Sequence, residues 1–259
     1  MTAEALLLHL RYLLVGPFPN GPLSGAALTL WMALLACAAS TAAGIAFALL
    51  LDQLDRLDTR AGACIAGALR GTLATLRAVP VLMLMFWAYF LIPMALGVAV
   101  PETATVVSAL AAVGAAYIAQ SMQAGLRAVG TGQRHAALAL GMSPGQALLA
   151  VVLPQAWRIM LPSVANQWVS TVKDTSLAYI VGVVELSTAA NQVNSRIVAY
   201  PAAVFGAVAV LYFVLCSGIE TLPRWLRAGR RAPARRPARA SPRQRFLRWR
   251  ARPAADACT

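Results

Sequence analysis

The sequence predicts an all-α membrane protein with five transmembrane helices, and three observations lead to this fold class. Of the 259 residues, 59% are hydrophobic and only 12% are charged, whereas a soluble domain carries about 25% charged residues. Several segments reach the roughly 20 apolar residues that a helix needs to cross the hydrocarbon core. Arginines collect in alternate connecting segments. Together these features exclude a soluble globular enzyme.

Five segments are long and apolar enough to span a membrane as helices. They cover residues 26–50, 78–101, 103–126, 161–186 and 197–219. The fourth segment is mostly apolar although it contains Lys173, Asp174 and Glu185. Residues 59–76, which are rich in Ala and Gly, are expected to lie along the inner membrane surface before the chain turns into the second span at Pro80.

The stretch 136–157 is also uncharged, but its glycine and proline residues argue against a sixth span. Gly141 is typical of a helix stop, Ser143 of an N-cap and Pro144 of a first helical residue. Pro154 is expected to interrupt the helix again. Two short helices joined by a turn cannot cross a bilayer, because the backbone groups of the turn would lack partners in lipid. This stretch is therefore predicted to form a compact cytoplasmic loop.

The arginines predict the orientation of the chain, because cytoplasmic segments are enriched in Lys and Arg. One set of connecting segments contains Arg56, Arg60, Arg70, Arg77, Arg127, Arg134, Arg158 and the arginines of the C-terminal tail. The opposite segments contain only Arg11 and Arg196. This distribution puts the N-terminus outside and the C-terminus in the cytoplasm, which requires an odd number of spans.

The C-terminal residues differ in composition from the rest of the chain. Residues 224–259 hold twelve arginines and a single acid, Asp256, so the preceding residues carry a net charge of +2 against +13 for the whole chain. The high charge therefore does not indicate nucleic-acid binding. We expect an extracytoplasmic segment at 1–25, a transmembrane domain at 26–223 with its cytoplasmic loop at 127–160, and a disordered cytoplasmic tail near anionic lipid headgroups.

Catalytic and metal-binding motifs are missing from the sequence. Cys37, Cys64 and Cys216 sit in apolar stretches, and the only histidines are His9 and His135, so the sequence predicts neither a metal site nor a bound cofactor. A nucleotide-binding Walker A loop needs Gly before its Lys, but the only lysine follows a valine. We therefore expect a protein that is not an enzyme and whose energy source belongs to a partner.

That only lysine, Lys173, is predicted near the middle of the fourth span, where a charge costs about 2.5–3.5 kcal/mol on insertion scales. Asn166, Ser170 and Lys173 recur at helical spacing and share one face, whereas Asp174 points about 100° away. Three interpretations stay open. Lys173 forms a buried ion pair that fixes packing, it belongs to the solute path or its gate, or the helix starts later than residue 161.

Three further polar residues lie in or beside the spans. Gln120 and Gln123 of the third span serve either as interhelical hydrogen-bonding groups or as part of the solute path. Arg77 precedes Pro80 at the inner boundary of the second span, where an arginine can anchor the helix by reaching the headgroups. His135 is expected to be a surface or contact residue.

The cytoplasmic loop resembles the EAA signature of permease subunits in ATP-binding-cassette importers. Matching segments occur in the family's order at residues 132–142 (GQRHAALALGM), 153–156 (LPQA), 161–162 (LP) and 173–177 (KDTSL). The segments 77–80 (RAVP) and 116–119 (AYIA) are similar to the polar-amino-acid branch. The resemblance covers residues 23–223, and within that branch the chain looks most similar to glutamate/aspartate permeases.

This resemblance implies a fold, a set of partners and two groups of functional residues. The fold would be that of a type I importer permease in the bacterial inner membrane. An extracytoplasmic binding protein would deliver the amino acid, an identical or homologous second permease would complete the pathway, and a dimer of ATPase subunits, which hold ATP and Mg²⁺, would dock inside. The residues implied in ATPase coupling are Gln133, His135, Ala136, Ala137, Gly141, Met142 and Pro154. Those assigned to the solute path or gate are Arg77, Gln120, Gln123, Asn166, Ser170, Lys173 and Asp174.

The chain departs from the family pattern at three positions. His135 stands where the signature name expects Glu, and Gln120 and Gln123 stand where the third span usually carries Glu and Arg. The first change alters a charge contact to the ATPase, and the other two remove a charge pair near the path.

Two other functions compete with the importer. An ion-gradient-driven secondary transporter would use Lys173, Asp174 and Glu185 as relay groups, but such folds usually contain internal repeats, which this sequence lacks. A structural assembly subunit that recruits partners through its arginine tail would leave the interrupted loop unexplained. The sequence therefore favours the importer permease.

Overall fold

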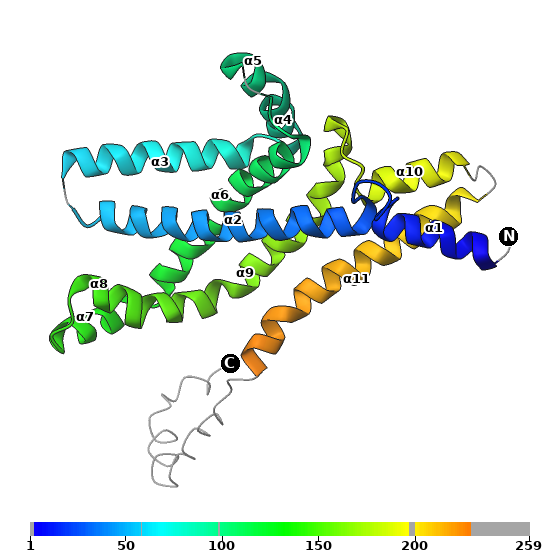
Figure 1. Ribbon diagram of the computed structural model, residues 1–259. Coiled ribbons are helices and arrows are strands. Elements are labelled where there is room, and N and C mark those ends of the chain that lie inside the picture. The colour runs from blue at the N-terminus through cyan, green and yellow to red at the C-terminus, as the bar shows by residue number, and fades with distance from the viewer. Residues whose placement is uncertain (1–2, 58, 98, 197–199, 229–259) are drawn as a thin grey trace, which may run out of the picture. The chain divides into compact units, whose positions relative to one another are not determined.

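A computed structural model describes residues 3–57, 59–97, 99–196 and 200–228, and helices account for most of them (Figure 1). The helices are α1 (Ala3–Val15), α2 (Gly25–Leu54), α3 (Arg60–Ala78), α4 (Val81–Phe86), α5 (Ile92–Leu96), α6 (Glu102–Ala128), α7 (Thr131–Ala139), α8 (Pro144–Gln146), α9 (Leu153–Asp174), α10 (Leu186–Arg196) and α11 (Pro201–Ala228). Two π-helical turns, Trp87–Leu91 and Ala147–Val152, and a 3-10 helix, Thr175–Val181, continue them. The expected tail lies almost entirely outside the described residues.

The predicted all-α membrane fold is confirmed, although two of the predicted spans have other boundaries. Four helical segments in the described part of the chain are long and apolar enough to cross a membrane: Gly25–Leu54, Glu102–Ala128, Pro144–Val181 and Pro201–Thr221. A fifth span results if Arg60–Ala78 and Val81–Ala95, which meet at an angle of 103°, count as one broken helix.

The centre of the fold is a close crossing of α2 and α6. A Cβ atom added to Gly44 would lie 2.8 Å from the Cβ of Ile118 and 2.9 Å from the carbonyl oxygen of Ala115. Gly114 approaches α2 in the same way, because its added Cβ would lie 2.8 Å from the Cβ of Ser40. Small residues of this kind let helix backbones come together in membranes, where packing drives association.

Helix α9 completes the central layer by packing against both α6 and α2, and the Trp168 indole N–H of α9 donates to the Thr41 hydroxyl of α2 at 3.0 Å. Gly125 lies against the backbone of α9, where an added Cβ would be 3.0 Å from the Ala156 carbonyl oxygen. Met122 of α6 and Met160 and Val164 of α9 are buried in the same cluster. The mutual packing of α2, α6 and α9 therefore fixes the position of the C-terminal end of α6, from which α7 follows.

Helix α3 runs beside the C-terminal half of α2 (Figure 1). One buried cluster contains Leu51 of α2, Ala66 and Leu73 of α3, and Ala116 of α6. The expectation that residues 59–76 lie along the membrane surface is therefore wrong, because α3 shares the direction of a spanning helix. These apolar side chains are buried by α2 and α6 rather than by lipid headgroups.

The sharp bend after α3 follows from Pro80. The residue before it, Val79, is extended, with φ −82° and ψ 132°, because a proline disfavours the helical conformation in the preceding residue. The apolar segment that follows is divided into α4, a π-helical turn and α5. The predicted span 78–101 is therefore not a straight helix of its own.

The N-terminal ends of α2 and α10 meet around a buried carboxylate. The Glu185 side chain is fully buried and caps α10, accepting hydrogen bonds from the backbone N–H groups of Ser187 (2.7 Å) and Thr188 (2.8 Å). The hydroxyls of Thr188 and Tyr212 donate to it as well, at 3.1 and 3.2 Å. Burial raises the pKa of the Glu185 carboxyl, and these hydrogen bonds oppose the shift.

Helix α1 belongs to the same end of the fold. The Tyr12 hydroxyl donates to Oε1 of Gln192 at 2.6 Å, and the Arg196 guanidinium lies 5.1 Å from the centre of the Tyr12 ring. Leu13 is buried with Leu186 and neighbouring residues of α10 and α11. The expected N-terminal segment 1–25 is thus largely a helix that packs on α2 and α10.

Gly44→Ala should destabilise the protein by about 1–3 kcal/mol, because the added methyl group overpacks the α2–α6 crossing. The matched control is Gly71→Ala in the middle of α3, where nothing lies within 4 Å of an added Cβ, so the control should be neutral or slightly stabilising. Thermal unfolding of the two variants in detergent measures the difference. Equal melting temperatures would contradict the proposed role of this crossing.

Candidate functional site

The predicted loop is a helical hairpin whose turn is fixed by two capping motifs. Helix α7 ends at Ala139, and Gly141 in the turn that follows has φ +83°. The N–H groups of Gly141 and Met142 donate to the carbonyl oxygens of Leu138 (3.0 Å) and Ala137 (3.2 Å). These two hydrogen bonds form a Schellman motif. Ser143 then begins the next helix through a reciprocal capping box with Gln146. The predictions for Gly141, Ser143 and Pro144 are confirmed.

The predicted second interruption at Pro154 is wrong. The chain is helical from Pro144 to Val181 without a break. The π-helical turn Ala147–Val152 directly precedes Pro154. In a regular helix, the proline ring clashes with the carbonyl group four residues before it, and proline has no N–H to donate to that carbonyl. The wider π-helical turn changes this spacing and accommodates the proline. The hairpin therefore consists of α7 and the first turns of one long helix. Within the expected loop 127–160, the turn between these two arms ends at Ser143, and the residues after it belong to the long helix.

The residues assigned to ATPase coupling divide by exposure. Gln133, His135, Ala136 and Gly141 are exposed on α7 and its turn, and Pro154 is exposed further along the long helix.

Ala137 is instead buried, at 4% exposure, on the side of the hairpin that also buries Ala147, Leu148 and Val152. Its small side chain therefore serves the closure of the hairpin. Met142 is half-buried.

Leu140 is a functional candidate that the sequence analysis missed. Its side chain is 83% exposed at the tip of the hairpin, next to Gly141, and Leu149 on the second arm is 59% exposed. An apolar side chain held out by a rigid turn is suited to insertion into a partner protein.

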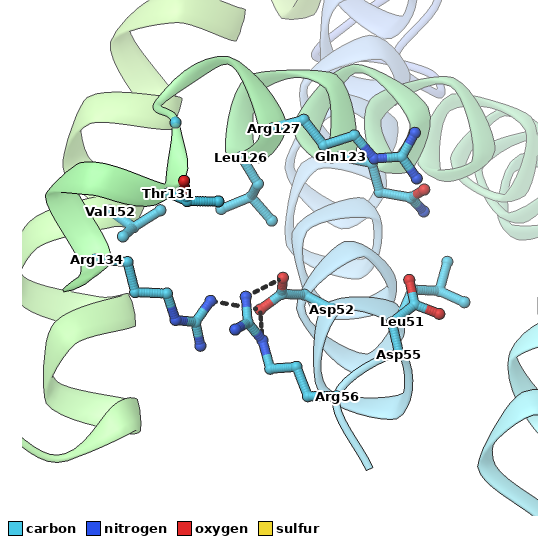
Figure 2. A pocket seen from close by; sticks show the side chains of 11 residues that line it. Leu51, Asp52, Asp55, Arg56, Gln123, Leu126, Arg127, Thr131, Arg134 and Val152 are labelled. Atoms are coloured by element: carbon cyan, nitrogen blue, oxygen red, sulfur yellow. Dashed lines mark hydrogen bonds and ion pairs between the residues drawn. The ribbon is translucent and has the colours of Figure 1, made fainter. Parts of the chain in front are cut away.

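A cavity of about 200 Å³ separates the hairpin from the C-terminal end of α2 (Figure 2). Its walls carry many charged and polar side chains, including Asp52, Asp55, Arg56, Gln123, Arg127 and Arg134. Arg134 of α7 reaches across to Asp52, with 3.5 Å between Nη1 and Oδ2. Gln123 therefore faces this cavity, whereas Gln120 belongs to another contact.

That contact joins α3 to α6. Nη1 of Arg77 donates to Oε1 of Gln120 at 2.7 Å, and the Tyr117 hydroxyl lies 3.5 Å from the Arg77 carbonyl oxygen. The interhelical alternative for Gln120 is thus observed, and Arg77 has a protein partner in addition to any headgroup contact.

The long helix exposes a polar stripe. Asn166, Ser170 and Lys173 share one exposed face, as their spacing predicted, while the adjacent Asp174 is half-buried. Lys173 lies near the C-terminal end of α9, which ends at Asp174, and the continuous helical segment extends to Val181. The Lys173 side chain is exposed within the single chain. The ion-pair and solute-path interpretations of Lys173 both stay open.

The candidate residues thus form separate groups. The hairpin residues lie together on α7 and its turn, Arg77 lies with Gln120, and the polar stripe lies on α9. The recorded hydrogen bonds and ion pairs of the described residues connect none of these groups with another. In the same part of the chain, no three His, Cys, Asp or Glu side chains lie close enough together to hold a metal ion.

Comparisons with known proteins give a consistent result. Residues 44–227 match the family described as "Binding-protein-dependent transport system inner membrane component". The glutamine transport system permease protein GlnP of Escherichia coli is 33% identical over 199 residues, which cover 74% of this chain and 85% of that protein. The glutamate/aspartate import permease protein GltK of Escherichia coli is 32% identical over 127 residues, covering 46% and 57% of the two chains.

A solved structure shares the fold. The crystal structure of an amino acid ABC transporter with histidines contains a chain that superimposes with a TM-score of 0.70 at 24% identity. The match covers 88% of the present chain and 98% of the other.

Proposed function

The chain belongs to the family of inner-membrane components of binding-protein-dependent transport systems, and we propose that it carries a polar amino acid into the cell as the permease subunit of an ATP-driven importer. Its partners in this proposal are a dimer of ATPase subunits, a second permease that is identical or homologous, and an extracytoplasmic binding protein. ATP and Mg²⁺ belong to the ATPase. The chain itself supplies the helices of the pathway and the surface on which the ATPase docks.

The hairpin is the observation that supports this role most directly. A Schellman motif and a capping box hold its turn rigidly, and Leu140 projects from the tip. The second arm continues as one helix from Pro144 to Val181, which is about 57 Å at 1.5 Å per residue. This length exceeds the roughly 30 Å hydrocarbon core. The same rigid helix therefore carries both the docking turn outside the membrane and the polar stripe within it.

The proposed mechanism uses this continuity. ATP binding closes the ATPase subunits and displaces the hairpin through contacts at Gln133, His135, Ala136 and Gly141. The long helix transmits the displacement to Asn166, Ser170 and Lys173, which face the pathway or the second permease. Moving such an equilibrium from 1:99 to 99:1 takes about 5.5 kcal/mol of differential binding, so the transmitting element must not bend. In this arrangement the hairpin and the C-terminus are cytoplasmic and α1 lies outside.

Glutamate or aspartate is the proposed substrate, from the similarity of the chain to glutamate/aspartate permeases. A second candidate is glutamine, because a glutamine permease is 33% identical over most of its length. Gln120 and Gln123 also leave the third span without the charge pair of the family pattern, which suits a neutral amino acid.

Reconstitution of the purified importer in proteoliposomes tests both levels of the proposal. We expect uptake of labelled glutamate only when ATP is present on the side of the vesicle membrane that carries the ATPase and the binding protein is present on the other side. Excess unlabelled glutamine should compete weakly if the acidic substrate is correct, and strongly if glutamine is carried. Uptake that needs an ion gradient and no ATPase would contradict the importer function and support the secondary transporter.

Gly141→Trp should lower the rate of uptake at least tenfold, which corresponds to an increase of about 1.4 kcal/mol or more in the activation free energy of transport. ATP hydrolysis should continue, and the subunit should stay in the membrane. The bulky side chain would hold the ATPase away from the hairpin. Gly141→Ala is the matched control, because it carries the same strain of a left-handed residue, about 1–2 kcal/mol, without the bulk. Uptake and hydrolysis are measured in parallel. Equal losses in the two variants would mean that strain, not docking, causes the effect.

Lys173→Met should reduce uptake about tenfold without reducing the amount of assembled complex, because the side chain is exposed on α9. Lys173→Arg keeps the charge and should retain most of the activity. Uptake per mole of complex, recovered by affinity purification, measures the effect. If assembly falls in parallel with uptake, Lys173 stabilises an interface instead of contributing to the path.

A further inference from the structure

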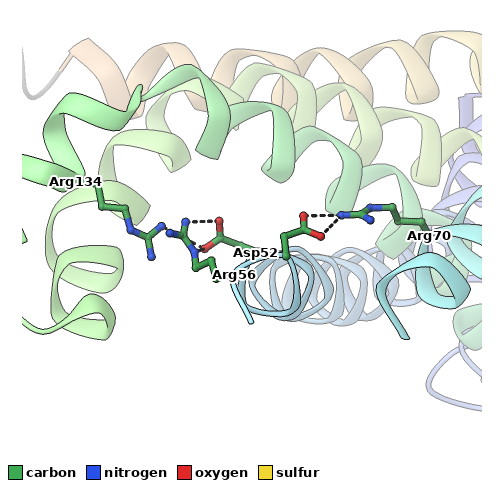
Figure 3. Close-up of polar contacts among 5 residues, drawn as sticks. Asp52, Arg56, Arg70 and Arg134 are labelled. Atoms are coloured by element: carbon green, nitrogen blue, oxygen red, sulfur yellow. Dashed lines mark hydrogen bonds and ion pairs between the residues drawn. The ribbon is translucent and has the colours of Figure 1, made fainter. Parts of the chain in front are cut away.

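The C-terminal end of α2 carries two acids where a helix disfavours negative charge. Asp52 lies in the last turn and Asp55 is the C-terminal cap, and no basic residue lies in that turn. Because the C-terminus of a helix carries a partial negative charge, both carboxylates need cations from elsewhere. Asp55 receives Arg70 of α3, and Asp52 receives Arg134 of α7 (Figure 3). The end of α2 thus holds a neighbouring helix on each side.

The contact to α7 is the more protected of the two. The side chains of Arg134 and Asp52 are 13% and 19% exposed, against 42% and 44% for Arg70 and Asp55. Partial burial makes an ion pair less sensitive to screening by solvent and salt. Asp52 also accepts two hydrogen bonds, at 2.6 and 2.9 Å, from Arg56, which follows the C-terminal cap of α2. Figure 2 shows Arg56 and Arg134 approaching the same carboxylate.

The Arg134–Asp52 ion pair joins α7 to α2 across a cavity. The 200 Å³ cavity lies between the end of α2, the end of α6 and the start of α7, so side-chain packing does not fill the space between α7 and α2. On its other side α7 rests on the second arm of its own hairpin, through Ala137. In the described part of the chain, the Arg134–Asp52 pair is the one polar side-chain contact recorded between α7 and α2.

We infer that Asp52 and Arg134 are positioning residues that make α2 move together with the hairpin, so that the ATPase acts on two spans instead of one. The inference rests on the proposed coupling role of the hairpin. Displacement of α7 reaches the long helix through the covalent turn at Gly141, and it reaches α2 through this ion pair. Since α2 packs tightly on α6 at Gly44, the second route carries the movement into the central layer.

The test uses the complete importer with its ATPase and binding protein in proteoliposomes, and it measures ATP hydrolysed per amino acid imported. Arg134→Gln and Asp52→Asn should each raise this ratio about five-fold, the low end of coupling between sites, with unchanged binding of the ATPase. Arg134→Lys keeps the charge and should restore most of the coupling. The double variant should be no worse than either single variant, because the two residues act as one unit.

A matched control isolates the contact to α7. Asp55→Asn removes the pair to Arg70 of α3 and leaves Asp52 and Arg134 in place. This variant should keep the normal ratio. An unchanged ratio in Arg134→Gln, or additive effects in the double variant, would overturn the inference.

The outcome is separable from that of the proposed function. If Gly141→Trp uncouples the importer and Arg134→Gln does not, the hairpin is the coupling element and the ion pair has no part in it. If the ATPase neither binds nor drives the unmodified chain, the proposed function itself fails.

Discussion

The close approach of α2 and α6 is the constraint on which the rest of the structure depends. Lipid offers helices little hydrophobic reason to associate, so close packing must supply the attraction. Gly44 and Gly114 bring the two backbones together from opposite helices, and Gly125 does the same for α6 and α9. A three-helix layer results, and each peripheral element is positioned by one of its members. Helix α3 lies on α2 and α6, α7 follows the end of α6, and the long helix includes α9.

Prolines have two different effects on the helices of this protein. One ends a helix, and others lie where the helix continues. At Val79–Pro80 the chain turns by 103°, because the residue before the proline leaves the helical region. At Pro93 and Pro154 the helix continues, and in each case a π-helical turn lies directly before the proline. A widened turn moves the carbonyl four residues back away from the proline ring. An interrupted helix transmits little force, whereas the helix at Pro154 continues without a break to Val181.

This difference also explains how far the sequence could predict the site. Gly141, Ser143 and Pro144 act through local backbone geometry, so their roles could be predicted from residue type and spacing alone. Pro154 has the same residue type as Pro144, but its effect depends on whether the preceding turn can widen. The direction of α3 was not predictable locally, because its amphipathic pattern suits a membrane surface and a face of α2 and α6 equally well. Only the packing of Ala66 and Leu73 on Leu51 distinguishes them.

The acidic side chains at the two ends of α2 have different partners. The free energy needed to separate each acid from its partners therefore differs between the two ends. Glu185 is fully buried and receives four hydrogen bonds from uncharged donors, so separating it from α10 or α11 would leave a buried carboxylate without partners, which is costly. Asp52 and Asp55 are partly exposed and bind arginines of other helices. Ion pairs of this kind are worth about 0–1 kcal/mol each, and water can replace a lost partner. Rearrangement therefore costs less at the hairpin end than at the Glu185 end. In the proposed coupling, the long helix is therefore held near Val181, and its hairpin end moves together with α2 through the Arg134–Asp52 pair.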